Sequence, residues 1–118
     1  MPGVDRAVAR RTAERYVAAV NAGDASAVAE LFTHDAEVIH PSRGHHKGID
    51  AVRAFYEDGL QHGPHLEIRT LAVDGPLCIL EVLGSSESHD RRQLVVDHFT
   101  LADDGRISRN ALFLGPTS

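Results

Sequence analysis

The chain has 118 residues, a formal net charge of −5 at pH 7, and 42% hydrophobic and 25% charged residues. This length fits a single domain, residues 1–118, and the composition is typical of a globular protein. The negative charge argues against a nucleic-acid partner, because phosphate binding needs clustered lysine and arginine. No apolar run reaches the length of a membrane span, and the first residues lack the pattern of a signal peptide. We therefore expect a cytoplasmic protein with no membrane or nucleic-acid partner.

The first half of the chain predicts three helices and one short strand. Apolar residues between positions 4 and 20 keep to one helical stripe, and Gly23 suits a left-handed helix end. Asp24 is placed to cap a second, shorter helix, and Pro41 ends the strand. In chain order, the expected elements are a helix over 4–20, a helix over 24–32, a strand over 36–40, a loop over 42–48 and a helix over about 49–62.

The second half of the chain predicts strands. From His65 onward, the side-chain pattern has a period of two, and turn signals such as Asp74-Gly75-Pro76 separate the runs. The four predicted strands cover 66–73, 77–85, 93–102 and 106–114, with a polar turn over 86–91. Helices first and strands last indicate an α+β fold whose helices pack on one face of a mostly antiparallel sheet.

The cysteine and histidine content argues against a metal site. Cys78 is the single cysteine of the chain, which excludes an internal disulfide, and its apolar neighbours indicate a buried residue. His40, His45 and His46 lie close together, but their spacing matches no zinc motif, and histidines in a polar loop are usually solvated. We expect neither a metal nor a cofactor.

Several segments resemble the bacterial Δ5-3-ketosteroid isomerases. The match begins with RYVAAVNAGD at residues 15–24 and continues through Leu31-Phe32, Asp35-Ala36, Pro41, Phe55-Tyr56, Asp97-His98-Phe99 and Ala111-Leu112-Phe113. It spans nearly the whole chain, and the order of elements agrees with the wider NTF2-like and SnoaL-like superfamily. The resemblance implies a cone in which three N-terminal helices pack on a curved sheet around a pocket for one small organic molecule. Because this fold hosts many chemistries, the pocket residues must identify the reaction.

The resemblance also implies roles for individual residues. In ketosteroid isomerases, a carboxylate moves a proton next to a ketone, while a tyrosine and a protonated aspartic acid donate hydrogen bonds to the oxyanion. Tyr16 matches that tyrosine, Asp97 matches the aspartic acid, and Tyr56 matches a tyrosine that supports the network. Phe99 and Phe113 match residues that line the substrate pocket.

The residue patterns support these roles for Tyr16 and Asp97. Tyr16 lies on the apolar stripe of the first helix, where its hydroxyl group needs a partner. Asp97 interrupts an apolar strand, where a buried carboxyl group must be paired or protonated. The base departs from the family, because His40 stands where the isomerases have an aspartate before the proline. A neutral imidazole can act as a general base near pH 7, so His40 indicates retained proton abstraction, a changed reaction or a lost one.

Two charged residues bear on the polarity of the pocket. Alternation places Glu81 on one face with Ile79 and Leu83, and Arg109 on one face with Ile107 and Phe113. In the alignment with the isomerases, both charges fall at positions that face the cavity. There they would form a pair with each other or with His40, and the substrate would be an oxygenated compound. A one-residue shift in register would instead place both charges on the outer face.

The outer face of the sheet predicts a partner surface. His98 alternates to the face opposite Asp97, together with apolar residues such as Leu94 and Val96. The resemblance implies that this face forms a homodimer.

Three functions remain open from the sequence. The first is an isomerase that shifts an allylic double bond, with His40 as the proton carrier and with Tyr16 and Asp97 holding the oxyanion. The second is a SnoaL-like cyclase, dehydratase or epoxide hydrolase that uses His40, Glu81, Asp97 and Arg109 on a polyketide-like substrate. The third is a ligand-binding domain that has lost its base.

Overall fold

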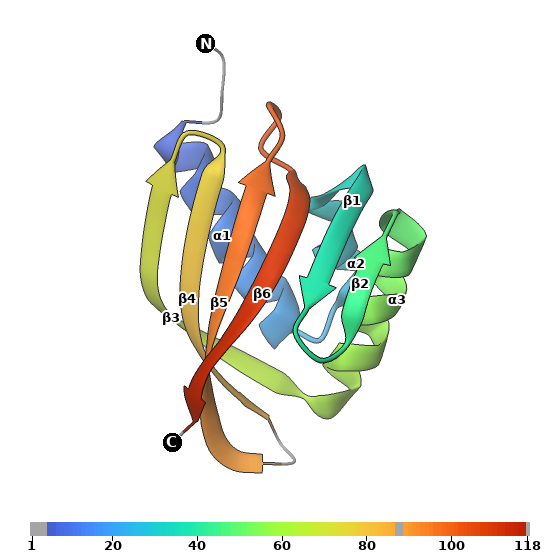
Figure 1. The fold of residues 1–118 in the computed structure, drawn as a ribbon, viewed down its shortest axis with the longest axis vertical. Helices are drawn as coiled ribbons and strands as arrows, with labels where there is room; N and C mark the ends of the chain where they lie inside the picture. The colour runs from blue at the N-terminus through green and yellow to red at the C-terminus, as the bar shows by residue number, and fades with distance from the viewer. Residues whose placement is uncertain (1–4, 87–88, 118) are drawn as a thin grey trace.

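A computed structural model describes residues 5–86 and 89–117 of the chain (Figure 1). These residues form three α-helices, one short 3-10 helix and six strands. The helices are α1 (Arg6–Asn21), α2 (Ala25–Glu30), α3 (Ile49–Gly59) and the 3-10 helix η1 (Leu60–His62). The strands are β1 (Phe32–His40), β2 (Gly44–Lys47), β3 (Pro64–Asp74), β4 (Leu77–Ser86), β5 (His89–Leu101) and β6 (Ile107–Thr117).

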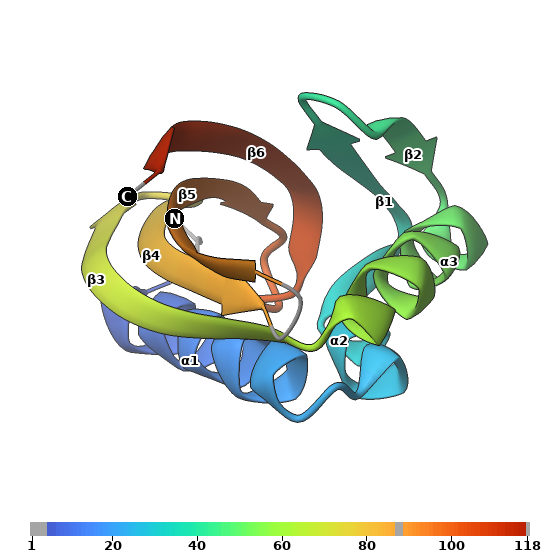
Figure 2. The same ribbon diagram turned by 90° about the horizontal axis from the view of Figure 1, so that it is seen from below.

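The strands form one sheet in the order β2-β1-β6-β5-β4-β3. Only the pairing of β1 with β6 is parallel, and all other neighbours are antiparallel. The sheet curls around its helical side: α1 lies across β3 and β4, and α3 lies beside β1 and β2 (Figure 2). This arrangement confirms the α+β, NTF2-like fold that the sequence predicts.

Local side-chain chemistry sets the ends of the helices. The carboxylate of Asp5 accepts a hydrogen bond from the Val8 amide at 2.9 Å, and that of Asp24 accepts one from the Ala27 amide at 3.0 Å. Both are helix N-caps, which satisfy amides that have no partner within the helix. Gly23 follows α1 with φ of 68°, a left-handed conformation that glycine adopts without steric strain.

The core lies between the inner face of the sheet and the helices. On β4, Cys78, Leu80 and Val82 are fully buried, while the residues between them lie on the other face. Burial of one such aliphatic side chain contributes about 1.5–3 kcal/mol relative to its exposure. The largest fully buried side chains of the described residues include Phe99, Leu80, Ile107, Val28, Val38 and Val52.

The largest differences from the predicted boundaries are at three places, and the other strand ends differ by at most three residues. The predicted loop over 42–48 contains β2, a short strand whose glycine and histidines carry no apolar alternation. The first strand begins at Phe32 rather than at residue 36, so α2 ends at Glu30. β5 begins at His89, inside the predicted turn. In each case, pairing with a neighbouring strand overrides a weak local signal. The expected helix start at residue 4 lies outside the described residues.

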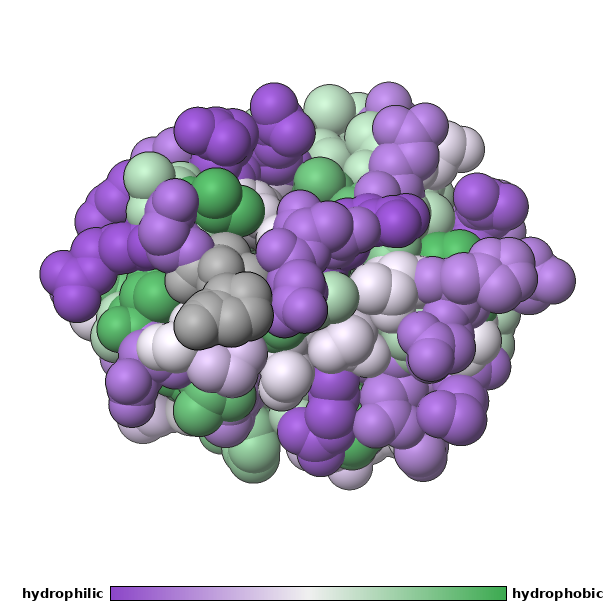
Figure 3. Space-filling model, turned by 90° about the horizontal axis from the view of Figure 1, so that it is seen from above, coloured by the Kyte–Doolittle hydropathy of each residue, from purple (hydrophilic) through white to green (hydrophobic). Residues whose placement is uncertain are grey.

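The surface is mixed in character. Seen from the end that carries the β5–β6 turn, it is mostly hydrophilic, and its apolar side chains lie in small separate groups (Figure 3). Within residues 5–86 and 89–117, no helix has both the length and the hydropathy that a membrane crossing requires.

Candidate functional site

Four buried polar side chains form a connected network, which we call the polar network: Tyr16, Tyr56, Asp97 and Asn110. The hydroxyl oxygens of Tyr16 and Tyr56 lie 2.9 Å apart, and the Tyr16 hydroxyl lies 3.4 Å from Oδ1 of Asp97. Asn110 Nδ2 donates to Oδ1 of Asp97 at 3.0 Å and to the Tyr56 hydroxyl at 3.2 Å. Residues from four elements, distant in sequence, therefore meet at one point.

The periodicity of each element explains this meeting. Tyr16 lies on the buried stripe of α1, three residues after Ala13 and four before Val20. Asp97 lies on the inner face of β5, and β5 residue Phe99 pairs with Asn110 across the ladder to β6. The Phe99 ring packs edge-on against Tyr16, with 5.1 Å between ring centroids. Phe99 thus contacts the polar network through Tyr16, whereas the residues that line the cavity do not include Phe99, which the resemblance places there.

Burial controls the ionisation of the polar network. Asp97 is 1% exposed, and loss of hydration raises the pKa of its carboxyl group to about 6, although the hydrogen bonds from Asn110 and Tyr16 act in the opposite direction. Burial, and next the negative charge of Asp97, raise the pKa of Tyr16 well above its usual value. Burial also raises the pKa of Tyr56. Both phenols therefore stay neutral near pH 7, while the carboxyl group changes its charge slightly below it.

A cavity of about 170 Å³ lies beside the polar network. Tyr16, Tyr56 and Asp97 line it together with His40 and Arg43. The volume is below the range of roughly 300–1,000 Å³ that is common for pockets that enclose drug-sized ligands. The apolar part of the wall includes Val20, Phe55, Leu60, Leu66, Val95 and Leu112. The cavity therefore suits a small, largely apolar molecule that carries a polar group.

His40 lies at this cavity, and its hydrogen bonds determine its tautomer. The backbone amides of Ser42 and Arg43 both lie 3.1 Å from Nδ1 of His40, so Nδ1 must act as the acceptor. A neutral ring that accepts at Nδ1 carries its proton on Nε2. Burial first, and then the positive charge of Arg43, lower the pKa of His40. The ring is therefore neutral at pH 7, with an N–H donor at Nε2 rather than a free lone pair.

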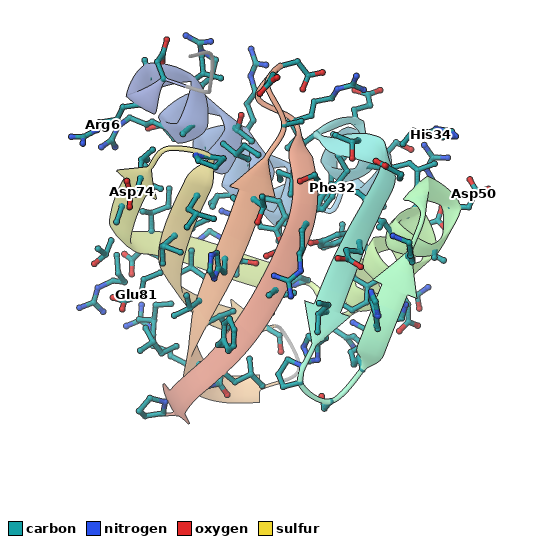
Figure 4. The ribbon with its side chains drawn as sticks, turned by 45° about the horizontal axis from the view of Figure 1, so that its top comes forward. Arg6, Phe32, His34, Asp50, Asp74 and Glu81 are labelled. Atoms are coloured by element: carbon teal, nitrogen blue, oxygen red, sulfur yellow. The ribbon has the colours of Figure 1, made fainter. Side chains whose placement is uncertain are left out.

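Glu81 corrects one sequence-based expectation. The inner face of β4 is filled by Cys78, Leu80 and Val82, so Glu81 lies on the outer face. Its Oε1 accepts a hydrogen bond from the Thr70 hydroxyl at 3.3 Å on β3, and the residue lies on the side of the sheet remote from β1 (Figure 4). Alternation alone could not choose the face, because both sets of alternate residues between Leu77 and Leu83 are apolar apart from Glu81.

Arg109 and Phe113 also lie outside the cavity. Nε of Arg109 lies 3.4 Å from Oε1 of Glu37, a residue of the outer face of β1. Phe113 is 55% exposed and pairs with Val96 on the outer face of β5. A register shift between β5 and β6 near Ile107 breaks the parity that grouped Ile107 with Arg109. Both charged residues therefore lie on the outer face, Arg109 because of the register shift and Glu81 because Cys78, Leu80 and Val82 fill the inner face.

Sequence reasoning missed two residues. Asn110 links Asp97 and Tyr56 through hydrogen bonds, yet a single asparagine in a strand has no distinctive sequence pattern. Its Oδ1 is buried and has no hydrogen-bond partner among the described residues. Arg43 lines the cavity from the turn between β1 and β2, a segment that the sequence predicts only as a polar loop. Neither residue has a signal that could have been found without the tertiary structure.

The clustered histidines have separate partners. Nε2 of His45 lies 2.6 Å from Oε2 of Glu37, and Nε2 of His46 lies 2.8 Å from the carbonyl oxygen of Arg43. Across the part of the chain that the structure describes, no group of three or more His, Cys, Asp and Glu side chains is placed to hold a metal ion.

Comparison with known proteins agrees with this architecture. The family model described as a SnoaL-like domain matches residues 13–110. The epoxide hydrolase/cyclase-like enzyme SalBIII, which has a role in pyran ring formation in the polyether salinomycin, is 23% identical, with a TM-score of 0.84 over 94% of this chain and 93% of that chain.

Two further solved structures carry provisional assignments. A protein from Kribbella flavida, provisionally a ketosteroid isomerase, is 24% identical with a TM-score of 0.75, covering 93% of this chain and 79% of that chain. A protein from Sinorhizobium meliloti, provisionally a polyketide cyclase, is 23% identical with a TM-score of 0.78, covering 87% of this chain and 94% of that chain. At these identities the likeness shows the fold alone, and it is the family match that confirms the resemblance at the level of the SnoaL-like superfamily.

Proposed function

The chain belongs to the SnoaL-like domain family, and from that premise we propose that it is an acid–base enzyme that moves a proton next to the carbonyl group of a small, largely apolar substrate. The favoured reaction is the allylic isomerisation of a β,γ-unsaturated ketone. One observation carries the proposal: a buried carboxyl group, that of Asp97, lines an apolar cavity beside a neutral tyrosine, and its pKa of about 6 lies close to neutral pH. A proton carrier is most effective when its pKa lies near the working pH.

The hydrogen bonds of the site favour Asp97 rather than His40 as the proton carrier. His40 accepts at Nδ1 and so has its proton on Nε2, which makes it a donor toward the cavity. The hydrogen bonds from Tyr16 and Asn110 to Asp97 both end at Oδ1, so neither of them occupies Oδ2. The roles expected from the family resemblance are therefore exchanged in this proposal.

The proposed reaction has two proton transfers. The Asp97 carboxylate takes a proton from the carbon between the carbonyl group and the double bond, and the electron pair of that C–H bond delocalises into a dienolate. The Nε2–H of His40 is the neutral donor available to the developing oxyanion, while the Tyr16 hydroxyl donates to Oδ1 of Asp97. Protonated Asp97 then returns the proton to the far carbon of the former double bond. The double bond moves into conjugation, and Asp97 is again a carboxylate.

The two other functions expected from the sequence lose part of their support. The cyclase, dehydratase or epoxide hydrolase hypothesis used four polar groups, and two of these, Glu81 and Arg109, lie on the outer face. The ligand-binding hypothesis depended on the loss of the family's aspartate base, whereas Asp97 supplies a carboxyl group to the same cavity.

A pair of substitutions tests the proposal. A small ketone such as cyclohex-3-enone is the substrate, and the absorbance of the conjugated enone is the signal. Asparagine and glutamine keep an N–H donor but cannot carry a proton. We therefore expect Asp97→Asn to lower kcat by about 10²–10⁴-fold, whereas His40→Gln lowers it by less than about tenfold. Activity of the wild type should rise with pH through about 6, as Asp97 ionises.

Each other result has a definite meaning. A severe loss in His40→Gln with a mild loss in Asp97→Asn would assign the base to His40 and the donor to Asp97. Binding of the enone product without turnover by the wild type would favour the ligand-binding hypothesis and contradict the proposal.

We also propose that the outer face of the sheet forms a homodimer. Apolar side chains on this face include Ile79, Leu83, Val96 and Phe113, and Phe113 is 55% exposed. The described helices all lie on the opposite side (Figure 2). An exposed apolar patch of this kind is typical of a protein interface. Light scattering should give the mass of two chains for the wild type and of one chain for Val96→Lys; a monomeric wild type would contradict the proposal.

A further inference from the structure

Arg43 is held in a fixed position at the cavity. Its Nη2 lies 2.6 Å from Oδ2 of Asp58 and donates to the carbonyl oxygen of Phe55 at 3.3 Å. The central guanidinium carbon lies 4.3 Å from the centroid of the Phe55 ring. These contacts combine an ion pair, a hydrogen bond and a cation–π interaction. A long side chain that would otherwise be mobile is therefore oriented by α3.

Gly59 leaves the space that the guanidinium group occupies. A Cβ atom at position 59 would lie 2.9 Å from Nη1 of Arg43, closer than a side-chain carbon can approach. Both residues line the cavity. The backbone of Gly59 has helical angles, φ −65° and ψ −37°, which alanine adopts readily. The glycine therefore leaves room for the guanidinium group in this position, and a side chain at residue 59 would displace that group.

The cavity is lined by one cationic and one acidic side chain, Arg43 and Asp97. Arg43 supplies a permanent cation, and the contacts with Asp58 and Phe55 use Nη2, so they leave Nη1 for another partner. His40, whose Nδ1 accepts from the Arg43 amide, adds a neutral donor beside it. The carboxylate of Asp97 belongs to the polar network and would repel an anion. An anionic group therefore binds favourably at Arg43 and unfavourably at Asp97.

We propose that the substrate is a small oxo acid whose carboxylate binds Arg43. The carbonyl oxygen of the oxo acid then accepts a hydrogen bond from Nε2 of His40. Its apolar part extends toward Asp97, so that the carbon that loses a proton lies beside the Asp97 carboxylate. The volume of about 170 Å³ limits this molecule to a short chain or a single ring. The inference rests on the proposed function, because it names the substrate class of the same site.

Binding of two matched probes tests the inference without turnover. Phenylglyoxylate and phenylglyoxylamide share their shape and differ by one negative charge. Their affinities are measured by NMR titration of the full chain at pH 7, which also maps the binding site. We expect the acid to bind the wild type at least about tenfold more tightly than the amide, as a charge-assisted hydrogen bond predicts.

Three variants separate a local effect from a change of net charge. Arg43→Met should abolish the preference for the acid over the amide, and comparison of its NMR spectrum with that of the wild type shows whether the variant is folded. Gly59→Ala keeps every charge but displaces the guanidinium group, and it should reduce the preference. The control is Arg53→Met, an exposed position on α3, which should retain the preference.

The results distinguish this inference from the proposed function. Equal affinities of the wild type for the two probes, or an equal loss in Arg43→Met and Arg53→Met, would overturn the substrate class even if the ketone is isomerised. A preference for the acid that depends on Arg43, in a protein that isomerises no ketone, would uphold the anion site and overturn the proposed reaction.

Discussion

Two carboxyl groups on opposite faces of the same sheet respond to their surroundings in opposite directions. Asp97, on the inner face, is 1% exposed, and burial raises its pKa to about 6. Glu37, on the outer face of β1, has a lowered pKa, mainly because His45 donates a hydrogen bond to it and then because Lys47 and Arg109 are nearby. Both groups accept hydrogen bonds, so the number of partners does not explain the difference.

The difference lies in access to water and in the charge of the partners. The partners of Asp97 are a phenol and an amide, which are neutral, and burial removes its hydration. The partners of Glu37 include an arginine and a histidine at the surface, where water still solvates the carboxylate. Of these two carboxyl groups, only that of Asp97 has a pKa close to neutral pH, which is the property required of a proton carrier.

The largest expected effect on stability comes from removal of the inner charge. The folded pKa of Asp97, about 6, lies above the usual value of 3.8, so the folded state binds the proton more tightly than the unfolded state does. Wild-type stability should therefore fall as pH rises from about 4 to about 6. Asp97→Asn should stabilise the fold by about 2–3 kcal/mol above pH 6 and by almost nothing below pH 4, measured by urea unfolding. A difference independent of pH would contradict a raised pKa.

The next effect concerns the donor that keeps Asp97 ionised. Asn110 donates to Oδ1 of Asp97, and this hydrogen bond favours the charged form. Asn110→Leu should therefore raise the pKa of Asp97 further, by about one unit, since a hydrogen bond to a charged group contributes about 1.5–3 kcal/mol and part of this is lost to relaxation. The carboxyl carbon resonance of Asp97, followed by NMR against pH, measures the shift. An unchanged titration midpoint of Asp97 would mean that Asn110 does not influence the ionisation of the carboxyl group.

The smallest effect is expected on the outer face. Glu37→Gln removes the partner of His45 and Arg109, yet these contacts are at the surface. We expect a loss of less than about 1 kcal/mol at pH 7 in low salt, and a smaller loss in high salt, because surface ion pairs are weak and screened. Because the pKa of Glu37 is lowered, this contribution should disappear as pH falls below the usual range of a glutamate. Thermal unfolding at two salt concentrations is the measurement.

The helices and the residues of their buried faces could be predicted from the sequence. Tyr16 follows from the stripe of α1, and Asp97 follows from its place in an apolar strand, because each pattern is repeated along its own element. The faces of Glu81 and Arg109 could not be predicted. On β4 both sets of alternate residues are largely apolar, and on β6 a register shift interrupts the alternation. The sequence predicts that His40 lies at the cavity, because it precedes Pro41 as the aspartate of the isomerases precedes their proline. The tautomer of His40 instead depends on the backbone amides of the following turn.

By itself the sequence determined the three helices, their buried stripes and five of the six described strands, because these properties depend on periodicity within about ten consecutive residues. Only the tertiary structure decided which buried groups meet. Asp97, Asn110, Tyr16 and Tyr56 come from different elements, and Arg43 reaches the cavity through contacts with α3. The distances between these groups, and hence their ionisation, depend on how the sheet curls and on the exclusion of water. Both properties arise only when the elements pack together.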